Sequence, residues 1–67
     1  GRVELNTATL EQLCTLPGIG ESRARAILAY REEHGGFSVT EELMQVSGIK
    51  EGTFNRLREL IYIKDAK

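Results

Sequence analysis

Features that usually mark a secreted protein or a metal centre are scarce in this sequence. Its 67 residues include no tryptophan, one proline and one cysteine, Cys14. A lone cysteine has no disulfide partner in the chain and no second thiolate for a zinc site. A chain of this length buries only about 60% of its unfolded surface, which leaves little room for a deep catalytic pocket. These absences favour a single domain over residues 1–67 and argue against an enzyme or a bound cofactor.

Long apolar runs and an excess of positive charge are missing too. No apolar run approaches the roughly 20 residues that span a bilayer, and no basic segment followed by an apolar one resembles a signal peptide. Nine lysines and arginines stand against ten aspartates and glutamates, for a formal net charge of -1. We therefore expect a soluble segment that cannot hold nucleic acid through bulk charge alone, although charge of one sign can gather on one face.

Apolar periodicity and punctuating residues predict four helical stretches. The first starts at a capping box of Thr9 and Gln12 and ends at Pro17-Gly18. The second runs from about residue 21 to residue 34, where Gly35-Gly36 stops it. The core positions at helical spacing are Leu10, Leu13 and Cys14 in the first stretch and Ala24, Ile27 and Leu28 in the second.

The other two predicted helices are shorter. Ser38 and Glu41 form a second capping box before a helix that ends ahead of Gly48. The fourth helix begins near Gly52 or Thr53, and an extended, buried tail follows it over residues 61–63. No strand pair is needed, so the predicted class is all-α. The apolar positions of the fourth helix are Phe54, Leu57 and Ile61.

An internal repeat at an offset of 30 residues organises these helices. It matches Gly18-Ile19 with Gly48-Ile49 and Glu21 with Glu51. Repeat one covers about residues 7–35 and repeat two about residues 38–63. Two such units, stacked about a pseudo-two-fold axis, would bury each other's apolar faces and complete one core.

The turn at residues 16–20, hairpin one, carries the most constrained chemistry. Gly18 and Gly20 allow positive φ and a close approach of another molecule, while Ile19 is free to enter the core. The helix that follows presents unpaired N–H groups, which suit a phosphate oxygen. Ser22 adds a hydroxyl donor and Arg23 a cation in the same helical turn. The equivalent turn at residues 46–50 is hairpin two.

Residues 13–27 read Leu-x-x-Leu-Pro-Gly-Ile-Gly-x-x-x-Ala-x-x-Ile, which resembles the helix-hairpin-helix DNA-binding motif, and residues 43–57 are similar. Nearly the whole chain resembles the DNA-binding domain of the ComEA family of bacterial competence proteins. The resemblance implies a SAM-domain-like fold of four to five helices and no catalysis. It also implies non-sequence-specific binding of double-stranded DNA across the minor groove. The resemblance also implies other DNA-uptake proteins as partners, and a membrane-anchored parent protein that holds this domain outside the cytoplasmic membrane.

The same resemblance assigns the contacts residue by residue. Hairpin two departs from the family pattern because Lys50 replaces the second glycine. Either its side chain supplies a cation to a phosphate, or hairpin two is a structural copy. A monovalent cation could also sit on the carbonyls of Cys14, Leu16 and Ile19, or of Met44, Val46 and Ile49. The phosphate-facing groups implied by the resemblance are those of Gly18, Ile19, Gly20, Ser22, Arg23, Gly48, Lys50, Gly52 and Thr53.

Charge placement predicts a basic face. Arg23 and Lys50 lie closest to the turns, whereas the acids at 11, 32, 33, 41 and 42 lie on the other helices and the linker. The remaining arginines are better explained as solvated or paired side chains, with Arg31 pairing to a glutamate of its own helix. The residues in this second group are Arg25, Arg31, Arg56 and Arg58.

Other conspicuous residues have structural explanations. Tyr30 and Phe37 are expected to pack the joint between the repeats, and Cys14 to be a small core residue. His34 lies near a helix C-terminus, where the dipole favours its charged form. The adjacent acid pairs 32–33 and 41–42 point to different sides of a helix, which argues against a nuclease metal site.

Two other functions remain open at this point. One is a helical protein–protein interaction module, which would show an apolar patch at the turns in place of a basic rim. The other is a DNA-targeting appendage of a nuclease or repair enzyme, which differs only in what is attached to it.

Overall fold

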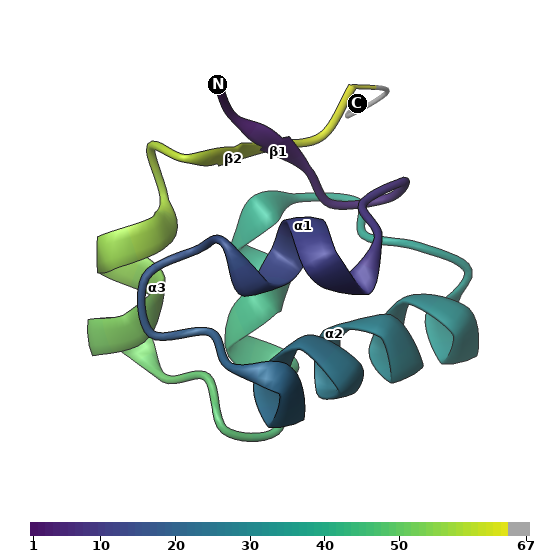
Figure 1. Ribbon diagram of the computed structural model, residues 1–67. Helices are drawn as coiled ribbons and strands as arrows, with labels where there is room; N and C mark the ends of the chain where they lie inside the picture. The colour runs from purple at the N-terminus through teal and green to yellow at the C-terminus, as the bar shows by residue number, and fades with distance from the viewer. Residues whose placement is uncertain (65–67) are drawn as a thin grey trace.

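The computed structural model describes residues 1–64 and confirms the all-α class, with a minimal strand pair added (Figure 1). Both ends of the described chain lie together at the top of Figure 1, opposite the start of the long helix α2. In chain order the elements are β1 (Val3–Glu4), α1 (Leu10–Cys14), α2 (Glu21–His34), the 3-10 helix η1 (Thr40–Gln45), α3 (Glu51–Leu57) and β2 (Ile61–Tyr62).

The strand pair corrects the expectation that none was needed. β1 and β2 run parallel, with Val3 opposite Ile61. The N–H of Val3 donates to the carbonyl of Leu60 at 2.7 Å, and the N–H of Leu5 donates to that of Tyr62 at 3.1 Å. Backbone groups that leave water need partners, and the extended tail supplies them to the N-terminal segment. The pair therefore ties the two terminal segments of the described chain to each other.

The predicted start of the first helix and the predicted stop of the second are confirmed, whereas the first helix ends at Cys14, ahead of Pro17-Gly18. The hydroxyl of Thr9 accepts from the N–H of Gln12 at 3.1 Å, and the Gln12 side chain accepts from the N–H of Thr9 at 2.9 Å. At the far end of α2, Gly35 takes the left-handed conformation with φ 72°, and its N–H donates to the carbonyl of Arg31. Both devices act within a few residues of sequence, which is why the sequence alone predicts them.

The predicted capping box of the third helix is wrong. The element is a 3-10 helix that starts at Thr40, and the carboxylate that caps it belongs to Glu42 rather than Glu41. This carboxylate accepts from the N–H of Ser38 at 2.6 Å and from that of Val39 at 3.3 Å. The fourth helix likewise begins earlier than predicted, at Glu51.

One apolar core joins the two repeats. Ile19 and Ile49, at equivalent positions of the two hairpins, are both buried. Cys14, in contrast, is exposed, which makes its predicted core role wrong. Leu13 is the buried residue of the five-residue α1, and the next side chain along a helix points about 100° away from it. The core comprises Leu5, Ala8, Leu13, Leu16, Ile19, Ala24, Ile27, Phe37, Leu43, Val46, Ile49, Phe54, Leu57 and Ile61.

The joint between the repeats contains the two predicted aromatics. The rings of Tyr30 and Phe37 stack with their centroids 5.0 Å apart, as expected, and the hydroxyl of Tyr30 donates to Glu42 at 2.7 Å. Asn6 then clamps the linker from the N-terminal side. Its amide donates to the carbonyl of Phe37 at 3.0 Å and accepts from the same residue's N–H at 2.7 Å.

Candidate nucleic-acid interface

Both hairpins share one backbone conformation. Gly18 has φ 79° and Gly48 has φ 89°, values in the left-handed region that favours glycine. In each hairpin the isoleucine N–H closes the turn, from Ile19 to Leu16 and from Ile49 to Val46, at 3.1 Å in both. The side chain of Ile19 is buried as predicted, so only its backbone could face a ligand.

The second position of each hairpin differs from the first. Gly20 is extended, with φ −91° and ψ −172°, so the positive φ considered for it is not used. A Cβ added to Gly20 would meet nothing within 4 Å. Lys50 takes nearly the same conformation, with φ −112° and ψ −178°. The fold therefore accepts a side chain here, and Lys50 leaves the hairpin backbone unchanged.

Several backbone N–H groups at the hairpins have no partner within the described residues. In hairpin one these are the N–H groups of Gly18 and Gly20, and the first bond of α2 runs from Ala24 to Gly20 at 2.9 Å. In hairpin two they are the N–H groups of Gly48 and Lys50. Free amides of this kind, in an exposed turn, can donate to an anion.

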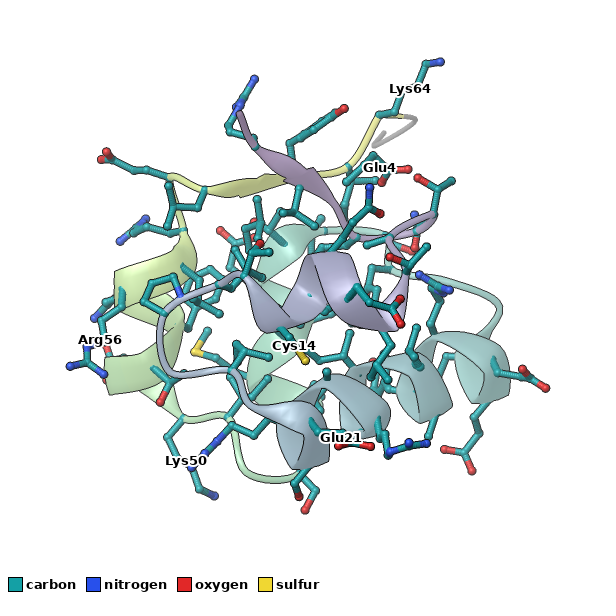
Figure 2. All side chains as sticks on the ribbon, viewed as in Figure 1. Glu4, Cys14, Glu21, Lys50, Arg56 and Lys64 are labelled. Atoms are coloured by element: carbon teal, nitrogen blue, oxygen red, sulfur yellow. The ribbon has the colours of Figure 1, made fainter. Side chains whose placement is uncertain are left out.

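The predicted site residues come mostly to the surface around these turns. Figure 2 shows Lys50 and Arg56 pointing away from the body on the side formed by α3 and the hairpin loops, with Glu21 at the start of α2. Thr53 is half-buried. The exposed members of the predicted set are Gly18, Gly20, Ser22, Arg23, Gly48, Lys50 and Gly52.

The hairpins contact each other through side chains of the opposite repeat. Arg23, on α2, donates from its Nε to the carbonyl of Gly48 at 2.8 Å. In the other direction, a Cβ on Gly18 would lie 3.6 Å from Nη1 of Arg56 and 3.9 Å from Cγ2 of Thr53. Arg23 and Thr53 are equivalent positions in the 30-residue repeat. Each hairpin glycine is thus covered by a residue from the partner repeat.

Two acids, Glu21 and Glu51, also lie beside the hairpins. Glu21 and Glu51 are the first residues of α2 and α3, where a helix dipole favours a carboxylate. Glu21 accepts from Nε of Arg25 at 2.9 Å, an exposed pair one helical turn apart. The rim of the hairpins therefore mixes both signs and is less basic than the sequence-based argument predicts.

Arg31 does not pair with a glutamate of its helix, which corrects that expectation. Its Nη1 donates to the carbonyls of Leu5 at 3.0 Å and Ala8 at 2.9 Å. These bonds hold the N-terminal segment against α2. Local spacing could not have indicated them, because the partners lie more than 20 residues away.

The described residues form neither a metal site nor a membrane-spanning helix. Across positions 1–64, no three His, Cys, Asp or Glu side chains are placed to hold a metal ion. Over the same residues, no helix has the length and apolar character to cross a membrane. His34 lies at the end of α2, with its ring stacked on Tyr30 at 3.9 Å. The monovalent cation on the hairpin carbonyls stays a prediction, and the Leu16 carbonyl already accepts from Ile19.

Comparison with known proteins gives consistent matches. A family profile described as the helix-hairpin-helix motif matches residues 1–62. ComE operon protein 1 of Bacillus subtilis is 48% identical over 92% of this chain. Endonuclease/exonuclease/phosphatase family domain-containing protein 1 of mouse is 38% identical over 98% of it. The chain spans only 30% and 12% of the length of these two relatives.

Proposed function

The chain belongs to the helix-hairpin-helix family, and from this membership and the hairpin geometry we propose that it binds double-stranded DNA without sequence preference. The predicted resemblance to the ComEA family is confirmed by the Bacillus relative. One observation carries the proposal: two turns with the same backbone conformation each expose N–H groups that have no partner within the described residues.

The proposed contact at hairpin one is made by the backbone. The N–H groups of Gly18 and Gly20 donate to phosphate oxygens, and Ser22 adds its hydroxyl. The fold does not need glycine at position 20, because its φ is ordinary and a Cβ would have room. A glycine at this position lets a phosphodiester approach the backbone closely, because no side chain stands in the way. Neutral donors also make a formal net charge of -1 compatible with a polyanion.

The proposed contact at hairpin two adds a side chain. Lys50 keeps the extended backbone of Gly20 and points into solvent beside the turn (Figure 2). A lysine at a helix start is unfavourable for the dipole, which is consistent with an anion that binds there. Gly52 and Thr53 complete the proposed set. The two hairpins would then meet phosphates of both strands across the minor groove.

An apolar docking face is the alternative at the same turns. Among the described residues, the large apolar side chains that are exposed are Val39 and Leu60, and neither lies in a hairpin. A rim with Arg23, Lys50 and Arg56 beside free amides suits phosphate better than an apolar helix. We therefore favour DNA over a protein partner.

The setting of the domain has two candidates. The 48% identity to ComE operon protein 1 favours a DNA receptor for uptake in a membrane-anchored parent. The match to mouse endonuclease/exonuclease/phosphatase family domain-containing protein 1 favours a DNA-targeting module beside another domain. Fractionation of the full-length gene product distinguishes them. Recovery with membranes supports the first, and recovery of a nuclease activity supports the second.

Binding to a labelled random duplex, titrated from 50 to 200 mM salt, tests the proposal. About four phosphate contacts predict a slope of log K against log salt of about −3.6. Between 50 and 200 mM salt this is a loss of roughly two orders of magnitude in affinity. Gly20→Asn and Gly20→Asp are a matched pair, because both side chains cap a helix well and differ only in charge. Asn should weaken binding, and Asp should weaken it much more. Binding without a salt slope, or full binding by Gly20→Asp, would refute the hairpin contact.

A further inference from the structure

We propose that Arg23 is a positioning residue: it holds hairpin two at a fixed distance from hairpin one and so sets which two phosphates the domain can bind together. This inference rests on the proposed DNA binding. It reassigns Arg23, which the sequence alone placed among the phosphate ligands of hairpin one.

The geometry of Arg23 favours this role. Its Nε donates to the carbonyl of Gly48 at 2.8 Å, across 25 residues of sequence. A Cβ on Gly48 would lie 3.6 Å from both Cγ and Nε of Arg23, so the side chain lies flat against the turn. Since α2 follows directly from hairpin one, the bond from Arg23 on its first turn connects the two hairpins.

The hydrogen bond between the repeats is asymmetric, and it is made to hairpin two, which departs from the family pattern. The residue equivalent to Arg23 in repeat two is Thr53, whose methyl carbon would lie 3.9 Å from a Cβ added to Gly18. Hairpin two, the copy that carries Lys50 in place of the second glycine, is the one whose turn accepts a side-chain hydrogen bond from the other repeat. Arg23 thus places the Lys50 cation and the free N–H of Gly48 relative to hairpin one.

A role in positioning differs measurably from a role as a cation. Arg25 lies two residues along the same helix, is exposed, and pairs with Glu21 rather than with hairpin two. Arg23→Gln and Arg25→Gln each remove one positive charge near the same hairpin. If charge alone matters, the two variants lose similar affinity for the duplex. Arg23→Lys keeps the charge but lacks the planar Nε–H that reaches Gly48.

The experiment is a double-mutant cycle on binding to the random duplex. We expect Arg23→Gln and Arg23→Lys to lose about tenfold in affinity and Arg25→Gln less than about threefold. In a Lys50→Gln background, the Arg23→Gln loss should shrink to about twofold or less, because hairpin two is already impaired. In a Gly20→Asn background the Arg23→Gln loss should shrink as well, because the spacing of the two hairpins affects affinity only when both hold a phosphate. Thermal unfolding of each variant is measured alongside.

The outcomes separate the two proposals. Wild-type protein without duplex binding overturns the proposed function and this inference together. Wild-type binding with equal losses for Arg23→Gln and Arg25→Gln, or full binding by Arg23→Lys, overturns the positioning role alone. An Arg23→Gln loss that stays the same in both backgrounds, together with a lower melting temperature, also overturns it, because a general loss of stability would then explain the effect.

Discussion

The Nε of Arg23 and the carbonyl oxygen of Gly48 are 2.8 Å apart, so a side chain of the first repeat closes on the turn of the second. In the opposite direction, Thr53 and Arg56 lie beside Gly18, at 3.9 Å and 3.6 Å from where its Cβ would be. Each hairpin is therefore supported by the repeat to which it does not belong. A substitution in one hairpin should consequently affect the stability of both repeats.

Gly48→Ala should destabilise the domain by about 1–2 kcal/mol. The cause is backbone conformation. Gly48 has φ 89°, and a residue with a side chain is less stable than glycine in this left-handed region. The added Cβ itself has room, at 3.6 Å from Arg23. Gly52→Ala is the matched control. It lies inside α3 with open space around it, and there the same change should stabilise by about 0.5–1 kcal/mol. Urea unfolding midpoints measure both, and shifts of the same sign would contradict the argument.

Glu21→Gln should strengthen duplex binding. The carboxylate is the first residue after hairpin one, where it repels a phosphate and engages Arg25. Its removal should raise affinity by about twofold at low salt, with the gain fading as salt screens the charge. The helix loses a favourable dipole contact of about 0.3–1 kcal/mol. Glu32→Gln, near the other end of α2, removes the same charge far from the hairpins. An equal gain in this control would show a net-charge effect only.

Arg31→Met should cost more stability than Arg25→Met. Arg31 donates to two backbone carbonyls of the N-terminal segment, those of Leu5 and Ala8, and the change leaves both without this donor. Hydrogen bonds from a charged group predict a loss of about 2 kcal/mol. Arg25 makes an exposed pair with Glu21, which is worth about 0.3–0.5 kcal/mol. Chemical denaturation compares the two, and equal losses would contradict the assignment.

Sequence reasoning succeeds here where the cause is local. The Thr9–Gln12 box and the Gly35 stop each act within one helical turn, and both are where the sequence predicts them. The repeated glycine turn was visible for the same reason. The partners of Arg31 could not be predicted from sequence, because they are backbone atoms that only the folded chain brings near.

The candidate site divides in the same way. The hairpin residues and their exposure were predictable from the turn chemistry of Gly18 and Gly48. The bond from Arg23 to Gly48 was not, because it depends on how the two repeats pack. Cys14 marks a related limit, since apolar spacing alone does not say how many faces of a five-residue helix are covered.

Tyr30→Phe should alter the response of the domain to acid. The Tyr30 hydroxyl donates to Glu42 at 2.7 Å, and this bond is the main cause that lowers the pKa of Glu42, followed by the Ser38 N–H. A carboxyl with a lowered pKa stabilises the fold above its ordinary pKa of about 4.3, and this contribution is lost as pH falls through the lowered value. The same bond raises the pKa of Tyr30, so its contribution is lost on the alkaline side as pH rises through the raised value.

Removing the hydroxyl should therefore move the pKa of Glu42 up toward its ordinary value and flatten the decline in stability at acid pH. Titration of the Glu42 carboxyl by NMR, with unfolding midpoints measured from neutral to acid pH, follows both quantities. Tyr62→Phe is the matched control, because it removes a phenol hydroxyl from β2, away from Glu42. A Glu42 titration unchanged by Tyr30→Phe, or moved equally by Tyr62→Phe, would contradict the role given to this hydrogen bond at the joint between the repeats.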